Sequence, residues 1–489
     1  MALLRGGRGV VSCGHPLAAS AGATMLAAGG TAADAAVAAG AMLCAVLPDA
    51  CGLGGDALAL VRSPGGEALA YNGSGAAPAA LAGPVPADGA GASAVPGALA
   101  ALADLHGRHG RLEWADVLRP AIATARDGMV LTETLAGTIA RHRPRLERRA
   151  PGWSTLDPSV RVGARLRQPE LAALLERIAA EGPAALYEGE VAAAIAAVAA
   201  ADGGSLAATD LAAHRTPVLA PITRERLGAT ITAQPPVSQA LLVLIALGAL
   251  EASDAAAGAD RVHHLVEAIV GAFAYRDAIG RADGASALAD APVEIDPDRA
   301  SCRTGPRAGA HTTAVAAADA GGTVVSMLLS VFEEFGSAAL VAPGGFFLNN
   351  RLHGFTAGEN RAAPGRRPVH TLSPLLVSHG RSTYALCTPG ADGQVQTLSQ
   401  ILAAVLLDGV SLPNALAAPR WRSGNGTLLV EDDYDSAVLA ELRRRGHQLV
   451  PLPHGVMEFG AAACAGIDAA TGTTFAVTDP RQEVWAAAV

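Results

Sequence analysis

The strongest constraint on the fold is a change of pattern in the middle of the chain. Upstream, apolar residues recur mainly at helical spacing, and residues 96–215 form a largely helical stretch broken by Gly and Pro stops. Residues 281–311 are rich in Ala, Gly, Asp, Pro and Arg without periodicity, which predicts an exposed, flexible linker. Downstream, residues 312–318 and 323–330 predict two strands joined by the turn Asp319-Ala320-Gly321-Gly322. Helices packed on both sides of antiparallel sheets would satisfy this order.

Two alanine-rich segments near the start predict a pair of closely packed helices. Residues 16–28 and 32–46 carry Ala, Leu and Met at helical spacing, and Gly29-Gly30 separates them. The glycine loop Cys51-Gly52-Leu53-Gly54-Gly55-Asp56 then leads into a predicted strand over residues 57–62. A nucleotide-binding loop is not expected, because a strand follows and the G-x-G-x-x-G spacing is missing.

The chain contains no lysine, since all 36 Lys+Arg positions are arginines. Pyridoxal Schiff-base chemistry, a P-loop and a Ser/Lys dyad are therefore excluded, because each needs an ε-amine. The net charge of −9 provides no electrostatic footprint for nucleic acid or an anionic membrane surface. No apolar run reaches about 18 residues, and the six cysteines follow no zinc or disulfide pattern. We expect a soluble cytoplasmic protein with neither nucleic-acid nor membrane partners.

Metal and cofactor chemistry lack a sequence signature. The chain has no H-E-x-x-H motif, no G-x-S-x-G elbow and no cysteine in a catalytic signature. His263 and His264 fall in a predicted helix beside Glu267, but adjacent histidines face different sides of a helix and cannot form the i, i+4 ligand pair of zinc enzymes. We expect a structural role for both histidines, and neither a metal nor a cofactor in the reaction.

Thr312 is the candidate nucleophile because it opens a predicted strand directly after the linker. A threonine hydroxyl needs a base, and cleavage of the preceding peptide bond would supply one, the α-amino group of the same residue. An α-amine has a pKa of about 7.7–8.0, so a fraction is neutral near pH 7. The competing interpretation is that Thr312 and Thr313 are ordinary β-formers at the start of a strand.

Eight separated segments resemble the γ-glutamyltranspeptidase family of N-terminal nucleophile hydrolases, and the order and spacing hold over nearly the whole chain. The segments are residues 29–39, Gly52-Leu53-Gly54-Gly55-Asp56, Val95-Pro96-Gly97, residues 110–114, Leu186-Tyr187-Glu188-Gly189, Phe335-Gly336-Ser337, Leu348-Asn349-Asn350 and Ala418-Pro419-Arg420. The resemblance implies an α+β fold, the four-layer αββα sandwich. It also implies a precursor that cuts itself into residues 1–311 and 312–489. Thr313 is the alternative cut site, because the family's T-T-H or T-A-H signature reads Thr312-Thr313-Ala314 here.

The resemblance also assigns roles around the nucleophile. Ser330 takes the place of the hydroxyl that contacts the nucleophile from the neighbouring strand, and the backbone N–H groups of Gly390 and Ala391 take the place of the oxyanion donors. Such donors are worth about 2.7–4 kcal/mol each.

The residues that hold a γ-glutamyl group in the family are replaced in this chain. Ser74 stands for an arginine, His370-Thr371 for two serines, Phe332 for an asparagine, and Arg351 and Gly354 for two acids. Transfer of a γ-glutamyl group is therefore not expected, and Arg351 is instead suited to a carboxylate or a carbonyl-rich acyl group. The remaining motifs are similar to the branch that includes oxamate amidohydrolase. The candidate substrate-binding residues are Phe332, Asn350, Arg351, His370, Thr371 and Asp392.

The sequence thus predicts a self-processing amidohydrolase that cleaves a small amide other than a γ-glutamyl compound. An acyltransferase using the same acyl-threonine intermediate and a catalytically inactive family member are the alternatives. The expected partners are a small-molecule amide and the chain's own two subunits, with a homodimer or heterotetramer as the assembly.

Overall fold

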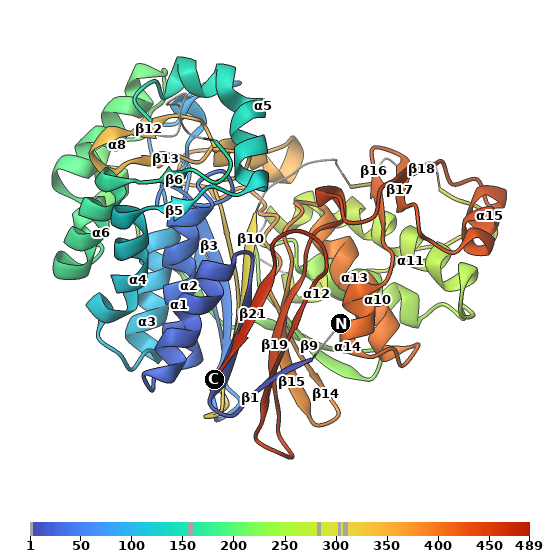
Figure 1. Cartoon of the computed structure of the whole chain (residues 1–489). Coiled ribbons are helices and arrows are strands. Elements are labelled where there is room, and N and C mark those ends of the chain that lie inside the picture. Colours follow the sequence, from blue (N-terminus) through green and yellow to red (C-terminus); the bar gives the residue numbers. More distant parts are fainter. Residues whose placement is uncertain (1–2, 154–160, 281–284, 302–304, 307–311) are drawn as a thin grey trace.

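The computed structural model describes residues 3–153, 161–280, 285–301, 305–306 and 312–489. Its architecture has four layers, because two antiparallel sheets face each other and helices cover the outer face of each (Figure 1). The helices of the N-terminal part, blue to green, lie over one sheet, and later helices, green to orange, lie over the other. This confirms the predicted αββα sandwich.

The first sheet has seven strands in the order β21-β2-β10-β11-β3-β4-β7, and its neighbouring strands run antiparallel. The strands are β21 (Trp485–Ala488), β2 (Gly9–Cys13), β10 (Thr313–Asp319), β11 (Val324–Ser330), β3 (Asp56–Arg62), β4 (Ala68–Gly73) and β7 (Val218–Leu219). The central hairpin β10–β11 confirms the predicted one, although its first strand begins one residue later than expected.

The second sheet also has seven strands, in the order β1-β20-β19-β15-β14-β9-β8. They are β1 (Leu4–Gly6), β20 (Thr474–Thr478), β19 (Ala463–Asp468), β15 (Ser382–Cys387), β14 (Leu375–His379), β9 (Ala229–Ala233) and β8 (Ile222–Arg226). Short strands outside both sheets are β5 (Met129–Val130), β6 (Arg165–Leu166), β12 (Leu340–Val341), β13 (Phe346–Phe347), β16 (Trp421–Gly424), β17 (Thr427–Glu431) and β18 (Leu449–Leu452).

Strand alternation separates the two faces of the hairpin. Ala314, Ala316 and Ala318 of β10 belong to the apolar layer between the sheets. Val315 and Ala317 point the other way and join the core beneath the helices. Because successive side chains of a strand point to opposite faces, this parity also fixes the direction of the residues at the strand's beginning.

The first helical layer rests on the alanine-rich pair that the sequence predicted. Its helices are α1 (Pro16–Ala27), α2 (Ala32–Val46), α3 (Ala98–His109), α4 (Trp114–Asp127), α5 (Glu133–Arg149), α6 (Pro169–Glu181), α7 (Ala184–Tyr187), α8 (Gly189–Ala201) and α9 (Ala208–Ala212). Every residue of α2 is buried, and small side chains on both helices allow the close approach of α1. Thr31 and Asp34 cap the start of α2 reciprocally, which satisfies backbone N–H groups that the first helical turn leaves free.

The second helical layer covers the other sheet. It contains α10 (Leu241–Glu251), α11 (Ala259–Ala272), α13 (Gly393–Leu406), α14 (Leu412–Ala417) and α15 (Ser436–Arg444). Within the predicted linker, α12 (Ala285–Leu288) and the segment 289–301 are described, whereas residues 281–284, 302–304 and 307–311 lie outside the described residues. In the part of the chain that the structure describes, no helix has the length and apolar character needed to cross a membrane.

Candidate active site

Thr312 lies at the end of the layer between the two sheets. It directly precedes β10 and is 6% exposed. Thr312 lies two residues before Ala314, so its side chain points to the same face of the strand, the one between the sheets. Its hydroxyl donates a hydrogen bond of 3.4 Å to the Ser330 hydroxyl oxygen, so these two residues are in contact.

Three neighbouring strands end in polar residues at this point. The register pairs Thr313 with Leu329 and Ser330 with Asp56, so Thr312, Ser330 and Asp56 form a row across β10, β11 and β3. Leucines and alanines occupy the preceding positions on the same faces. The apolar inter-sheet layer is thus replaced at its end by a hydroxyl, a second hydroxyl and a carboxylate.

Thr313 points away from this row. Its side chain is buried against Gly14, where an added Cβ would lie 2.4 Å from the Thr313 hydroxyl oxygen. Among the residues that the structure describes, that hydroxyl has no hydrogen-bond partner. The two adjacent threonines therefore occupy different environments, and the one beside Ser330 is Thr312.

The loop after β15 carries the two predicted oxyanion donors. Gly390 and Ala391 both have positive φ, at 122° and 50°. A non-glycine residue in this region costs on the order of 1–2 kcal/mol, so packing around the loop must hold Ala391 in place. Within the described residues, neither backbone N–H donates a hydrogen bond, while the carbonyl of Gly390 accepts from Gly393 and that of Ala391 from Gln394. Two backbone donors are thus left free beside the nucleophile's cavity.

A cavity of about 940 Å³ opens on Thr312 and Gly390. Helix α5 forms one wall through Glu133 and Arg141, and the β16–β17 hairpin with residues 455–458 forms the opposite wall. Arg141 of this wall pairs with Glu334 at 2.8 Å, which ties α5 to the loop after β11. A second, smaller cavity of about 50 Å³ also includes Thr312 and lies toward Gly14.

Asp56, Arg351 and His370 form a fully buried cluster next to Ser330. The Arg351 Nε donates to Asp56 Oδ2 at 2.6 Å, and His370 Nε2 lies 3.4 Å from the same oxygen. Burial raises the pKa of Asp56, but Arg351 and then His370 lower it by more, so that the pKa falls to about 2. Burial and then the charge of Arg351 lower the pKa of His370 to about 4. At neutral pH the cluster therefore holds a carboxylate, a guanidinium and a neutral imidazole, with no net charge.

One nitrogen of the Arg351 guanidinium, Nε, is therefore already hydrogen-bonded to Asp56. Its guanidinium also lies over the Phe332 ring, 4.6 Å from the ring centre, which brings these two predicted substrate residues together. Both Nη atoms are buried and have no hydrogen-bond partner among the described residues. The end of the guanidinium fork therefore has unsatisfied hydrogen-bond donors, although Arg351 lines neither of the two cavities described above.

The other predicted substrate residues have clear local partners. The Asn350 side chain donates to Glu333 Oε2 at 2.7 Å and accepts from the Glu333 N–H, so it fixes the loop after β11. Asp392 lies 3.7 Å from Arg276, an ion pair that spans the two halves of the chain. Thr371 is half-buried, and its carbonyl accepts a hydrogen bond from the Ser373 hydroxyl.

Ser74 stands where the family has an arginine, and its side chain is hydrogen-bonded to a neutral amide. Its hydroxyl donates to Asn72 Oδ1 at 2.6 Å, and it is completely buried. Its carbonyl accepts from Arg367 Nε at 2.8 Å.

Several site residues were missed by the sequence reasoning. Asp56 ends the motif Gly52-Leu53-Gly54-Gly55-Asp56, but no role in the site was predicted for it. A carboxylate that follows two glycines and opens a buried strand needs a charged partner, which was the available signal. The cavity walls Arg141, Glu334 and Arg422 carry no local motif that marks them. Two groups of potential metal ligands occur among the described residues, and neither includes Thr312, Ser330 or Gly390.

Known proteins share this architecture. The family profile described as gamma-glutamyltranspeptidase matches residues 18–489. The acylase ACY 1 proenzyme of Pseudomonas sp. (strain SE83) is 34% identical over 92% of this chain and 88% of its own length. The oxamate amidohydrolase proenzyme of Klebsiella pneumoniae is 32% identical over 97% of each chain. Among solved structures, cephalosporin acylase from Bacillus halodurans superposes with a TM-score of 0.87 at 28% identity, over 100% of this chain and 97% of that one. The chain therefore belongs to the γ-glutamyltranspeptidase family, as an N-terminal nucleophile hydrolase that acts on C–N bonds.

Proposed function

We propose that the protein cuts itself before Thr312 and then hydrolyses an amide other than a γ-glutamyl compound through an acyl-threonine intermediate. The observation that carries the proposal is the meeting of three parts at one cavity. The Thr312 hydroxyl contacts Ser330 at 3.4 Å, and the backbone N–H of Gly390 stands free at the same cavity. Nucleophile, orienting hydroxyl and oxyanion donor are the groups that acyl transfer requires.

The chemistry would proceed in two halves on the processed protein. The neutral α-amine of Thr312 takes the hydroxyl proton, and Oγ1 attacks the amide carbonyl. The oxyanion receives hydrogen bonds from Gly390 and Ala391, and collapse breaks the C–N bond while the ammonium returns its proton to the leaving amine. Water, deprotonated by the same amine, then attacks the ester, which releases the acid and restores the Thr312 hydroxyl.

The buried cluster beside Ser330 supports an acyl group without a γ-glutamyl ammonium. The carboxylate of this cluster, Asp56, is already paired with Arg351 at 2.6 Å and is therefore not available to such an ammonium. The free Nη atoms of Arg351 offer donors to carbonyl or carboxylate oxygens. We expect short acyl groups rich in carbonyl oxygen to be preferred over γ-glutamyl groups.

The cavity of about 940 Å³ favours a second candidate, acyl transfer to an amine. It is large enough for a drug-sized group, since ligand sites typically measure about 300–1,000 Å³. An amine acceptor held there would compete with water for the acyl-threonine. Product partitioning that depends on amine concentration would distinguish transfer from hydrolysis.

Intact mass and activity on a panel of amides test the proposal together. Purified protein should separate into two fragments that meet between residues 311 and 312, and Thr312→Ala should remain a single chain without activity. Thr313→Ala is the matched control, and it should still be cleaved before Thr312. An uncut wild-type chain that is inactive on α-keto amides, acyl amino acids and γ-glutamyl anilides would support the inactive alternative, and rapid γ-glutamyl turnover would refute the substrate assignment.

A further inference from the structure

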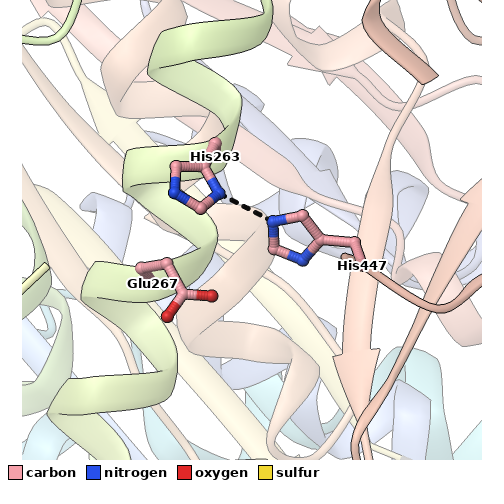
Figure 2. A group of neighbouring side chains, drawn as sticks. All are labelled: His263, Glu267 and His447. Atoms are coloured by element: carbon pink, nitrogen blue, oxygen red, sulfur yellow. Dashed lines mark hydrogen bonds between the residues drawn. The ribbon is translucent and has the colours of Figure 1, made fainter. Parts of the chain in front are cut away.

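A second group of reactive side chains lies in the other helical layer, outside the active site. His263 and Glu267 are one turn apart on α11, and His447 follows α15. Figure 2 shows His447 projecting from its loop toward the face of α11 that carries the other two. The three ligand atoms lie within 4.8 Å of one another. His263, Glu267 and His447 are 0%, 3% and 9% exposed, respectively. A buried pair of imidazoles and a carboxylate is a donor set typical of zinc.

The hydrogen bonds define which nitrogen of His263 is free to bind a metal. His263 Nε2 lies 2.8 Å from the backbone carbonyl oxygen of Asp296, which can only accept, so Nε2 carries the proton. His263 Nδ1 is then an acceptor and receives the proton of His447 Nε2, 2.8 Å away, so zinc can bind both nitrogens only when His447 carries its proton on Nδ1 instead. An imidazole whose second nitrogen donates to a backbone carbonyl is the usual arrangement of a metal-bound histidine.

A positively charged side chain lies near the group, and acidic neighbours pair with it. Arg445 is the nearby cation, and its charge is balanced by Asp260 at 2.9 Å and Glu441 at 2.8 Å.

Glu267 is held in place by the chain segment that leads to the cleavage site. One carboxylate oxygen of Glu267 accepts from the Ser301 N–H at 3.1 Å. The Ser301 hydroxyl oxygen is buried and has no hydrogen-bond partner among the described residues. The segment that supplies Asp296 and Ser301 thus orients two members of the group through its backbone.

We propose that His263, Glu267 and His447 supply three of the four ligands of one tetrahedral Zn²⁺ ion. Tetrahedral zinc with bonds of about 2.0–2.1 Å places its ligand atoms about 3.3 Å apart, so the two nitrogens must separate slightly and Glu267 must move inward. Mg²⁺ and Ca²⁺ are disfavoured, because two of the three donors are nitrogens. The site is remote from the reaction, since none of its residues lines a cavity that contains Thr312.

The position of the site gives it a function if the chain is cut as proposed above. His263 and Glu267 precede residue 312, whereas His447 follows it. A bound Zn²⁺ would therefore link the two subunits and hold the end of the large subunit beside the small one. Metal binding itself does not depend on cleavage, so the uncut Thr312→Ala protein must bind Zn²⁺ equally well.

Metal titration of the full-length protein tests the site. Protein stripped with a chelator should take up one Zn²⁺ per chain, and Co²⁺ should give the intense visible absorption of a tetrahedral site with nitrogen and oxygen ligands. His263→Gln and His447→Gln should each weaken Zn²⁺ binding at least about tenfold. His264→Gln is the matched control, because this neighbouring buried histidine lies outside the group and should leave the affinity unchanged.

Three results would overturn the proposal. They are binding below one equivalent in wild-type protein, an octahedral Co²⁺ spectrum, and affinities that do not change in folded His447→Gln. If His447→Gln does not fold, the stoichiometry and Co²⁺ spectrum of the wild-type protein decide the question. Equal uptake by Thr312→Ala separates failure of the zinc site from failure of self-cleavage. In cleaved wild-type protein, the chelator should also lower the urea concentration at which the subunits separate, and it should not do so in His447→Gln.

Discussion

The buried ion pair between Asp56 and Arg351 should contribute to the acid sensitivity of the protein. The structure lowers the pKa of Asp56 from 3.8 to about 2. A difference of nearly two units corresponds to about 2 kcal/mol of folding free energy. Because the folded pKa lies below the unfolded value, this contribution is complete above about pH 5 and is lost as the pH falls toward 2. Acid should therefore weaken the protein by neutralising Asp56 while Arg351 stays charged.

Asp56→Asn tests this by removing the charge at nearly constant shape. At pH 7 it should lower the free energy of unfolding by at least about 2 kcal/mol, because a buried pair that loses one partner typically costs about 3–5 kcal/mol. Urea unfolding followed by circular dichroism measures the change, best in the uncut Thr312→Ala background, where the subunits cannot separate. The variant should also lose part of the decline in stability between pH 5 and pH 2.

The matched control is the double variant Asp56→Asn/Arg351→Met. Removing both charges leaves no uncompensated guanidinium, so the double variant should be more stable than Asp56→Asn alone. An Asp56→Asn protein within about 0.5 kcal/mol of its parent, a change typical of an ordinary surface site, would refute the reasoning. A double variant no more stable than Asp56→Asn would do the same.

Three further predictions concern the reaction. Ser330→Ala removes the acceptor of the Thr312 hydroxyl and should lower kcat by about fivefold to tenfold, since a net hydrogen bond is worth about 1 kcal/mol; unchanged single-turnover rates would contradict this. Gly390→Ala should lower kcat by up to about 100-fold while the protein stays folded. The backbone φ of 122° disfavours any side chain, but there is space for one, because the nearest atom to the added Cβ is 3.7 Å away. An alanine variant with wild-type kcat would show that the loop geometry is unimportant. The profile of kcat/KM against pH should rise toward about pH 8 as the Thr312 amine loses its proton. The profile should show no step from His370 above pH 5, because the pKa of His370 is held near 4. A step near pH 6.5 that disappears in His370→Asn would contradict this.

Local sequence patterns were sufficient for the hairpin and for the helices around it. The turn Asp319-Ala320-Gly321-Gly322 and its flanking apolar runs predicted β10 and β11, because hairpins depend on neighbouring residues. The pairing of Asp56 with Arg351 joins residues 295 positions apart. No local pattern indicates such a contact, so the sequence assigned Arg351 to substrate alone.

The histidine cluster shows the same limit. Helical spacing in the sequence places His263 one turn before Glu267, whereas the adjacent His263 and His264 face different sides of the helix and predict no zinc pair. The third member, His447, is 184 residues away and approaches α11 through the packing of α15. Tertiary structure thus supplies a ligand that helical spacing could not.

The register of β10 provides the physical basis for choosing between the two adjacent threonines. A cut before Thr313 would create an amine beside a hydroxyl that faces Gly14, away from Ser330 and away from the row that ends in Asp56. A cut before Thr312 places the new amine on the residue whose hydroxyl already contacts Ser330. In a chain without lysine, no side-chain amine offers an alternative base. Strand alternation therefore favours Thr312 as both nucleophile and base, although the local sequence Thr312-Thr313-Ala314 leaves either residue open.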